Sequence, residues 1–371
     1  MRILHLLNDV HELGNGIINQ AVDLACLQAK AGHTVAVASA GGEYETLLGE
    51  YGVHHVHLNQ SRRPLSLLKT PIHYCNLIRA IQPDVVHTHM MTGVVLAALL
   101  RFIGTYRLVS TVHNEFQRSA ILMGVADRVI AVSQAVAESM QRRGIPPHKL
   151  RVVKNGTIGA PRLQRSRSTL PRQLCQPVIT TVAGMTDRKG IAELITAFEQ
   201  IAITFPDAHL YLIGDGPERA KYEQQATASP CRDRIHFEGF QPDPYCYLQA
   251  TDIFVLASRR EPFGLVLAEA RETGCAIIAS HVDGIPEALD QGKAGILVPP
   301  ANAQAIAAAL HTLLAQPEQL RYWQQQAQQN LDWLSVGRVH RETLDVYREV
   351  IAAKTPTASS LSTLSKQPNS Y

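Results

Sequence analysis

Two glutamates, Glu261 and Glu269, flank a Pro-Phe-Gly segment whose residue types suit the binding of an oxygen-rich ligand. Glu261 follows the apolar run Asp252–Ala257, so it falls on a loop at the carboxyl end of an expected strand, where open α/β sheets hold small molecules. Glu269 lies more than one turn inside the next helix, on the face of Leu265. The free N–H groups at Gly264 and Leu265 can hold an anion. This combination suits a nucleotide sugar, whereas the competing interpretation is a solvated loop acid and a helix-surface acid.

A second loop offers positive charge. Arg188 and Lys189 lie between Gly184 and Gly190, at an expected junction of strand and helix. Two adjacent cations at that place can neutralise a diphosphate leaving group. Taken alone, the loop is better explained as a solvated basic turn, so its interpretation depends on the residues around it.

The first half of the chain contributes a glycine loop and one histidine. The loop that ends at Gly16 leads into a helix, and its glycines let the backbone approach a ligand closely. It does not match the G-x-G-x-x-G pattern, so a dinucleotide is not indicated. His113 ends an expected strand, and we interpret it as a polar residue that faces a cleft.

Most of the sixteen histidines must be structural. His55 and His57, like His87 and His89, lie on one face of their strands and could chelate a metal ion. Neither a carboxylate nor a further histidine completes such a site, so we predict no metal. The sequence also lacks a phosphate-binding G-x-x-x-x-G-K-[ST] loop, a nucleophile elbow and a zinc motif. Kinase-like, hydrolase-like and metalloenzyme functions therefore lose their main support.

The composition is that of a soluble globular protein, with 46% hydrophobic and 18% charged residues. A length of 371 residues suits two domains. The formal net charge of +3 is too small to argue for nucleic acid as a partner. Residues 1–157 hold fifteen Lys or Arg against ten Asp or Glu, which suits an anionic or membrane-surface acceptor, although an ordinary solvated surface explains it as well.

The six cysteines are scattered without metal-type spacing, which predicts reduced thiols in a cytosolic protein. The first apolar run is too short for a signal peptide and fits a strand better. The longest apolar segment, Val94–Ile103, is interrupted by Arg101 and is too short to span a bilayer. We therefore expect a cytoplasmic protein, at most peripheral at the cytoplasmic face of a membrane.

Short apolar runs alternate with helical segments along both halves of the chain. This alternation predicts an α/β protein with two Rossmann-like, doubly wound parallel-sheet domains that face a cleft. The strands expected in the first half are Arg2–Leu7, Thr34–Ser39, His54–Leu58, Asp84–His87, Arg107–Val112 and Arg128–Val132. Those expected in the second half are Val178–Ala183, His209–Ile213, Arg234–Glu238, Asp252–Ala257, Ala276–Ser280 and Gly295–Val298.

The alternation pauses at residues 161–176, which are rich in Arg, Ser, Pro and Gln and are expected to be a linker. We place the N-terminal domain at residues 1–160 and the C-terminal domain at residues 177–334. The Ser/Thr-rich residues 354–371 are expected to be disordered.

Taken together, these loops resemble the retaining glycosyltransferases of family 4 (glycosyltransferase group 1), which have the GT-B architecture. The resemblance covers nearly the whole chain, and its most specific part runs from Glu261 through Glu269. Other segments match in the expected order: the loop ending at Gly16, Asp84–His89, Thr111–His113, Val129–Ser133, Lys154–Gly156, Arg188–Gly190, Gly214–Pro217, Gly284–Glu287 and Gly295–Pro299.

The resemblance implies a donor-binding role for several matching residues. Glu269 would bind the ribose hydroxyls of the donor. Glu261, with the backbone at Phe263 and Gly264, would hold the sugar hydroxyls. The amides of Gly264 and Leu265 would hold the diphosphate together with the two basic side chains described above.

The resemblance also implies roles for residues outside this segment. His113 would lie beside the transferred sugar, Gly16 would let the first domain close on the phosphate, and Gly184 would lie among the donor-binding residues. The helix at residues 335–353 would cross back to the first domain.

The sequence departs from the family pattern in three places. Met185 follows Gly184 where the family often has Gly-Arg-Leu and a longer loop, so an arginine that would grip the diphosphate is missing, and Arg188 is expected to replace it. Asn15 interrupts the frequent Gly-Gly pair. Asp283 stands where a second glycine usually precedes the Ile-Pro-Glu segment, which is expected to alter contacts to the sugar.

The implied activity is retaining, metal-independent transfer of a hexosyl-type sugar from a nucleotide-diphosphate sugar to a saccharide, lipid-linked or small-molecule acceptor. Such reactions belong to cell-envelope or polysaccharide biosynthesis, and no cofactor beyond the donor substrate is implied. The alternative is a catalytically idle GT-B-like binding or scaffold protein, against which the joint presence of Glu261, Lys189, His113 and Glu269 argues. A two-domain sugar-phosphate epimerase lacks support from the Glu-Pro-Phe-Gly loop.

The sequence leaves the sugar, the nucleotide base and the acceptor open. Arg62, Arg63 and Lys69, near the leucines of residues 65–68, could touch a membrane. An ordinary amphipathic helix explains that segment better.

Overall fold

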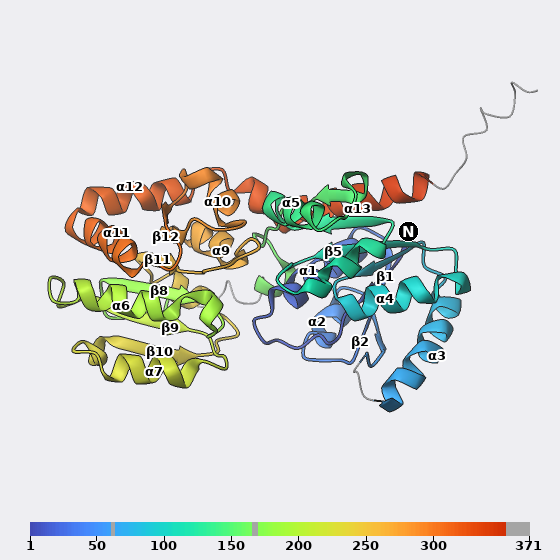
Figure 1. The fold of residues 1–371 in the computed structure, drawn as a ribbon, viewed down its shortest axis with the longest axis horizontal. Helices are drawn as coiled ribbons and strands as arrows, with labels where there is room; N and C mark the ends of the chain where they lie inside the picture. The colour runs from blue at the N-terminus through green and yellow to red at the C-terminus, as the bar shows by residue number, and fades with distance from the viewer. Residues whose placement is uncertain (61–63, 165–169, 354–371) are drawn as a thin grey trace, which may run out of the picture.

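The computed structural model describes residues 1–60, 64–164 and 170–353, without the side chains of residues 64–68. Two parallel sheets form two lobes that lie side by side (Figure 1). The predicted pair of doubly wound α/β domains is therefore confirmed. The predicted domain limits stay predictions, and the predicted disordered tail, 354–371, lies outside the described residues.

The first sheet contains seven strands in the order β3-β2-β1-β4-β5-β6-β7. These strands are β1 (Arg2–Leu6), β2 (Thr34–Ser39), β3 (His54–His57), β4 (Val85–Thr88), β5 (Arg107–Val112), β6 (Arg128–Ala131) and β7 (Leu150–Val152). The helices of this lobe are α1 (Gly16–Lys30), α2 (Glu45–Glu50), α3 (Pro64–Ile81), α4 (Met91–Leu99) and α5 (Gln134–Arg142), with short 3-10 segments that include η1 (Arg101–Ile103), η2 (Arg118–Val125) and η4 (Pro161–Leu163). The sequence did not predict β7 or α2, which are short.

The side chains of the first sheet alternate between two hydrophobic layers, because successive residues of a strand point to opposite faces. Leu4 and Leu6 of β1 pack with α3 and α4. Ile3 packs on the other face, with Ile18 and Val22 of α1. His5 lies two residues after Ile3 in β1, on the same face of the sheet, and therefore points toward α1.

The last helix, α13 (Val336–Ala352), lies along the N-terminal lobe, where Figure 1 shows it in red. Leu344, Tyr347 and Val350 share a buried cluster with residues of α1. The C-terminal end of the described chain therefore completes the core of the lobe that contains its beginning.

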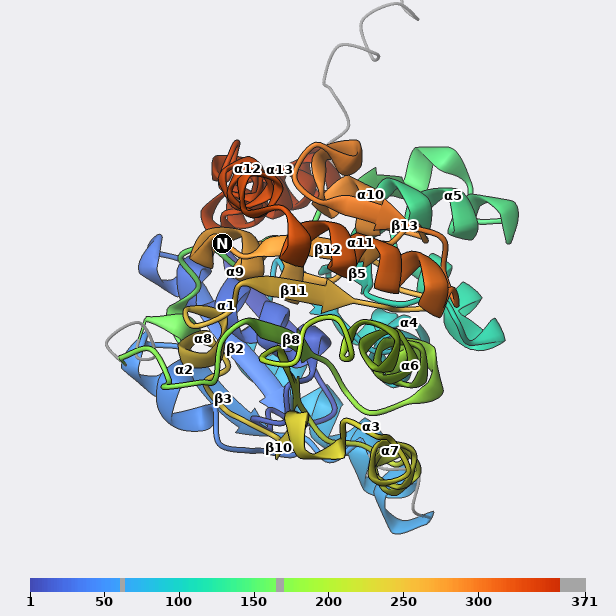
Figure 2. The same cartoon turned by 90° about the vertical axis from the view of Figure 1, so that its left-hand side faces the viewer.

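The second sheet contains six strands in the order β10-β9-β8-β11-β12-β13. These strands are β8 (Val178–Val182), β9 (His209–Ile213), β10 (Ile235–Gly239), β11 (Ile253–Leu256), β12 (Ala276–Ser280) and β13 (Ile296–Val298). The helices are α6 (Ile191–Ile201), α7 (Arg219–Thr227), α8 (Tyr245–Leu248), α9 (Leu265–Thr273), α10 (Ile285–Ala288), α11 (Ala303–Ala315) and α12 (Pro317–Ala327). Figure 2 shows α6 and α11 on one face of this sheet and α8 and α9 on the other, in agreement with the two buried clusters of the domain.

In the part of the chain that the structure describes, no helix combines the length and the hydrophobicity needed to cross a membrane.

Candidate active site

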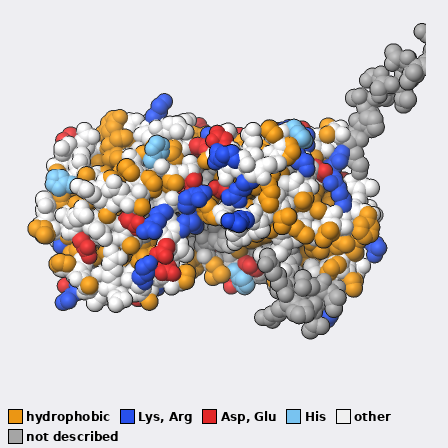
Figure 3. All heavy atoms as spheres, in the orientation of Figure 1, with side chains coloured by type: hydrophobic (Ala, Val, Ile, Leu, Met, Phe, Trp, Pro, Cys, Tyr) orange, Lys and Arg blue, Asp and Glu red, His pale blue; other side chains and the backbone are white. Residues whose placement is uncertain are grey.

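The two domains meet through loops that follow strands of both sheets. Gly16, after β1, lies against Leu265 at the start of α9, and a Cβ atom on Gly16 would be 3.0 Å from Leu265 Cδ1. Arg260, after β11, forms an ion pair with Glu115, after β5, with Nη2 3.3 Å from Oε1. Because these loops follow the carboxyl ends of parallel strands, the junction joins the sheet edges at which α/β proteins bind ligands. Figure 3 shows Lys and Arg side chains gathered over the waist between the lobes.

Glu261 is buried at this junction, accepts a hydrogen bond from Lys189 and forms an ion pair with Arg188. Its Oε2 atom lies 2.5 Å from Lys189 Nζ and 3.7 Å from Arg188 Nη1, and it also accepts from Ser258 Oγ at 3.3 Å. Among the described residues, no hydrogen bond reaches the other oxygen, Oε1. Glu261 is thus held through Oε2, which leaves Oε1 able to accept a further hydrogen bond.

Arg188 is fixed by groups from both domains. Its guanidinium donates to the carbonyl of Arg260 at 2.9 Å and lies 5.2 Å from the ring centroid of Phe116 in the N-terminal domain. The guanidinium of Arg260 lies 4.7 Å from the same ring. Phe116 could not be predicted from the sequence, because only the fold brings its loop to these cations.

The N-terminus of α9 is shaped by Gly264. This residue has a φ of +85°, in the left-handed region that favours glycine, and makes no side-chain cap for the helix. A Cβ atom there would also lie 3.1 Å from Leu267 Cδ1. Since no side chain among the described residues caps the first turn, the N–H groups at the start of α9 and the positive end of the helix dipole are available to an anion.

Glu269 takes part in an ion-pair network between the domains. Its Oε1 atom accepts from Arg162 Nη2 at 3.0 Å, and Arg162 Nε donates to Asp23 Oδ2, also at 3.0 Å. Asp23 is 1% exposed, and burial raises its pKa to about 6, while Arg162 acts in the opposite direction. Arg162 was not predicted as a site residue, because it falls within the predicted linker. The second oxygen of Glu269 has no hydrogen bond to any residue that the structure describes.

Asp283 takes a backbone conformation that favours glycine. With a φ of +45°, it directs its carboxylate to the N–H of Glu261 at 2.9 Å and to Arg260 Nε at 2.9 Å. Aspartate tolerates this left-handed conformation better than most residues with a Cβ. Asp283 therefore helps to position the loop that carries Glu261.

Glu287 joins α10 to the N-terminal domain. Its two oxygens accept from the backbone N–H groups of Gln134 and Ala135, both at 3.0 Å, at the start of α5. Lys154 Nζ lies 3.1 Å from the same carboxylate. The negative charge lies at the positive end of α5 and so stabilises the contact between the domains.

His113 follows β5 and belongs to a group of hydrogen-bonded histidines. Its Nε2 atom lies 3.0 Å from His89 Nδ1, and His89 Nε2 lies 3.0 Å from Nδ1 of the fully buried His5. Burial lowers the pKa of His113 to about 3 and that of His5 to about 4, so both rings are neutral near pH 7.

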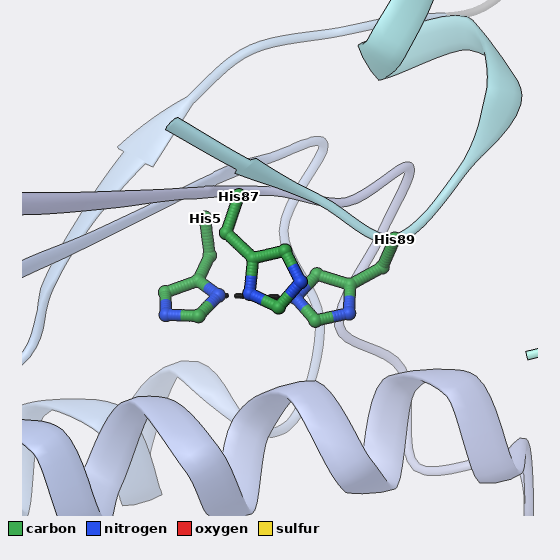
Figure 4. Close-up of side chains that lie close together, drawn as sticks. All are labelled: His5, His87 and His89. Carbon is green, nitrogen blue, oxygen red and sulfur yellow. Dashed lines mark hydrogen bonds between the residues drawn. The ribbon is translucent and has the colours of Figure 1, made fainter. Parts of the chain in front are cut away.

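The expectation that no further histidine accompanies His87 and His89 is wrong. His5 lies opposite His87 in the register of β1 and β4, and the candidate ligand atoms of His5, His87 and His89 lie within 4.8 Å of one another (Figure 4). The partner could be found only once the order of the strands was known.

The predicted site residues fall into separate groups. The structure brings Glu261, Lys189 and Arg188 into direct contact next to Phe263 and Gly264. Glu269 and His113 contact other partners, and no described hydrogen bond joins them to this group. The predicted ligand roles of all these residues stay predictions.

Gly184 is exposed after β8. A Cβ atom there would meet only the carbonyl oxygen of Asp215, at 3.7 Å, within ordinary contact distance. The space at this position therefore does not require glycine, and its predicted role at the donor stays a prediction.

Two parallel-sheet domains with a charged site between their strand ends define the GT-B class of protein. Residues 14–157 match the family model described as Glycosyltransferase Family 4, and residues 164–330 match Glycosyl transferases group 1. The chain belongs to this family of glycosyltransferases.

Two relatives illustrate the range within the family. The chain is 27% identical over 229 residues to the lipopolysaccharide core biosynthesis glycosyltransferase LpsE of Rhizobium meliloti (strain 1021). The aligned region covers 62% of this chain and 65% of LpsE. It is 30% identical over 260 residues to alpha-maltose-1-phosphate synthase of Mycobacterium tuberculosis (strain ATCC 25618 / H37Rv). Here the aligned region covers 64% of this chain and 66% of the synthase. The similar region spans just under two thirds of each relative.

Solved structures with the same fold include Anabaena Alr3699/HepE in complex with UDP and glucose. It has a TM-score of 0.78 and 22% identity, and the superposition covers 94% of this chain and 99% of HepE. WaaG, a glycosyltransferase involved in lipopolysaccharide biosynthesis, has a TM-score of 0.73 and 15% identity over 93% of this chain and 99% of WaaG. Both confirm the GT-B architecture.

Proposed function

We propose that the protein is a retaining, metal-independent glycosyltransferase that moves a hexose from a nucleotide-diphosphate sugar to a saccharide, lipid-linked or small-molecule acceptor. The observation that carries the proposal is the contact of Glu261 with Lys189 and Arg188 beside the uncapped N-terminus of α9. This group combines a hydroxyl acceptor with an anion site, as a nucleotide sugar requires.

The donor binds along α9. The N–H groups at Gly264 and Leu265 hold the diphosphate, and the free oxygen of Glu261 accepts from a sugar hydroxyl. The free oxygen of Glu269 accepts from a ribose hydroxyl, while Arg162 keeps that side chain in place. The complex of HepE with UDP and glucose supports uracil as the base and a hexose as the sugar.

In the transfer step, the bond between the anomeric carbon and the diphosphate oxygen breaks. The carbon becomes oxocarbenium-like while negative charge grows on the diphosphate, and Arg188, Lys189 and the helix N-terminus stabilise that charge without a metal ion. The acceptor hydroxyl attacks from the face that the diphosphate leaves and gives its proton to the departing oxygen. Because the acceptor attacks from the face that the diphosphate leaves, the configuration at the anomeric carbon is retained.

We assign the acceptor to the cell envelope, as the names of LpsE and WaaG support.

We also place the enzyme in the cytoplasm, with its N-terminal domain in peripheral contact with a membrane. Leu99 and Phe102, at the end of α4 and in η1, are 70% and 83% exposed, and Leu122 and Val125 of η2 are also exposed. Figure 3 shows hydrophobic side chains gathered on this face of the lobe. Arg62 and Arg63, which suggested such contact, lie outside the described residues.

The proposal is tested with a panel of nucleotide sugars and lipid-linked and saccharide acceptors, with and without EDTA. We expect release of a nucleoside diphosphate and transfer of the sugar, both insensitive to EDTA. A protein that transfers no sugar from any donor, and whose melting temperature no nucleoside diphosphate raises, would instead be a binding or scaffold protein.

The variants Glu261→Ala and Lys189→Ala test the site itself. We expect both to abolish most of the transfer while the fold is kept. Unchanged activity in both would remove this site from the mechanism.

A further inference from the structure

We propose that Gln28 sets the tautomer of His113 through a chain of buried hydrogen bonds, and that this positions a lone pair of His113 for the substrate. This histidine chain consists of four side chains, those of Gln28, His5, His89 and His113. The assignment of protons stands on the structure alone, whereas its effect on catalysis rests on the proposed function.

The histidine chain runs from the core of the N-terminal domain to the domain junction. Gln28 Oε1 lies 2.8 Å from His5 Nε2, His5 Nδ1 lies 3.0 Å from His89 Nε2, and His89 Nδ1 lies 3.0 Å from His113 Nε2. Gln28 and His5 are fully buried, and His89 is 3% exposed. Each ring is kept neutral by burial and so carries one N–H donor and one acceptor.

The group at the inner end sets the direction of every bond. A carbonyl oxygen only accepts, so Gln28 Oε1 requires the proton of His5 on Nε2. His5 Nδ1 then accepts from the Nε2–H of His89, whose Nδ1 in turn accepts from the Nε2–H of His113. His113 is left with a lone pair on Nδ1, which has no hydrogen-bond partner among the described residues. This atom can accept a hydrogen bond from a sugar hydroxyl.

The other end of the Gln28 amide belongs to a second branch. Its Nε2 donates to the hydroxyl of Tyr347 at 3.3 Å, and that hydroxyl donates to His87 Nδ1 at 2.6 Å. His87 Nε2 then donates to Thr111 Oγ1 at 2.7 Å. An amide turned the other way would reverse the protons along both branches, so Gln28 is the group on which the tautomer of His113 depends. Tyr347 belongs to α13, which therefore takes part in the arrangement.

The same rings could be considered as a metal site, because His5, His87 and His89 lie close together (Figure 4). Both nitrogens of each ring, however, already have a hydrogen-bond partner. A bound ion would have to displace several of these bonds. The hydrogen-bond pattern therefore favours fixed protons over a metal ion.

The test is the tautomer of His113 in long-range 1H–15N spectra of the histidine-labelled protein near pH 7 without substrate, with the signal assigned by its loss in His113→Gln. We expect a single tautomer with the proton on Nε2. Gln28→Leu should convert it to a mixture, and Gln28→Glu, which keeps an acceptor for His5, should preserve it. His236→Gln is the matched control, since it breaks another hydrogen bond between histidines, from His209 Nδ1 to His236 Nε2 at 2.9 Å in the C-terminal domain.

The kinetic test uses the same variants with the nucleotide-sugar donor. We expect Gln28→Leu to lower kcat about five- to tenfold, as for the loss of one hydrogen bond, with KM for the donor unchanged and with recovery in Gln28→Glu. The proposal is overturned if wild-type His113 carries its proton on Nδ1 or is mixed, if Gln28→Leu leaves the spectrum unchanged, or if the purified protein retains one equivalent of zinc. If Gln28→Leu does not fold, the wild-type and Gln28→Glu spectra decide. A wild-type protein that transfers no sugar refutes the proposed function, while the spectra still decide the tautomer.

Discussion

The two sides of the domain junction hold their polar side chains in different ways. On the C-terminal side, Lys189 and Glu261 form an ion pair with Nζ 2.5 Å from Oε2, next to the N-terminus of α9. On the N-terminal side, His5 and His113 are kept neutral by burial and are joined through His89. The charged side suits a diphosphate whose charge grows during transfer, and the neutral side suits an uncharged sugar. The two sides should therefore respond differently to acid and to substitution.

The largest difference between the two sides is expected in their stability in acid. The pKa values of His5 and His113 fall from 6.5 in the unfolded chain to about 4 and about 3 in the folded protein. The unfolded state thus binds more protons between these values, so the stability present above pH 6.5 is lost as the pH falls toward 4. By pH 4, each of the two histidines has lowered the free energy of unfolding by about 3 kcal/mol. Hydrogen exchange followed from pH 7 to pH 4 should show β1, β4 and β5 losing protection before β8 and β11. Loss of protection in the reverse order would contradict this difference.

Removing Arg162 should destabilise the junction nearly as much. Arg162→Ala leaves the buried carboxylates of Asp23 and Glu269 without their cation, and we expect a loss of about 3–5 kcal/mol in the free energy of unfolding at pH 7. Urea unfolding measures it. The matched control is Arg172→Ala, because the Arg172 side chain is 52% exposed and its Nη2 lies 3.9 Å from Glu238 Oε2. That variant should lose less than about 1 kcal/mol. Equal losses of unfolding free energy in the two variants would show that the buried ion-pair network does not stabilise the fold more than an exposed ion pair does.

Lys189→Ala should affect the reaction more than the fold. Without this cation the charge on the departing diphosphate is less stabilised, and kcat should fall about 100- to 1000-fold. Steady-state rates with the preferred donor give this value. Lys221→Ala, which removes an exposed cation paired with Asp187 at 2.6 Å, should stay within about twofold of wild type. A Lys189→Ala enzyme with nearly wild-type kcat would place the leaving group elsewhere.

The smallest expected effect concerns the contact of α10 with α5. Glu287→Gln removes the charge that faces the N–H groups of Gln134 and Ala135, and we expect about 1 kcal/mol less stability. Thermal unfolding of this variant is compared with that of Glu138→Gln, which alters an exposed side chain of α5. The expectation fails if both variants melt at the same temperature.

Much of the fold could be predicted from the sequence, because apolar periodicity reports local structure. The strands that flank the site were found, since runs such as Asp252–Ala257 are buried on both faces of a parallel sheet. The strand β7, which has Arg151 at its centre and no buried residue, and the short helices α2 and α10 leave too little apolar periodicity to detect.

The site was predictable where its residues are close in sequence and not where packing brings them together. Glu261, Gly264 and Leu265 belong to one segment, so their neighbourhood follows from the chain. Arg162 reaches Asp23 because η4 packs on α1, and it reaches Glu269 only because the domains meet, whereas its segment looked like a linker. The pairing of His5 with His89 required the strand order, although the alternation of His5 with Ile3 already indicated the face on which it lies.

The anomeric configuration of the product decides whether the junction performs retaining transfer. The reaction is followed by proton NMR with an α-linked nucleotide sugar and the acceptor identified in the panel. We expect the nucleoside diphosphate to appear together with an α-linked product from the first turnover onward, and both to disappear in Glu261→Ala. A β-linked product, or α-linked product formed equally fast by Glu261→Ala, would contradict the assignment of this junction as a retaining active site.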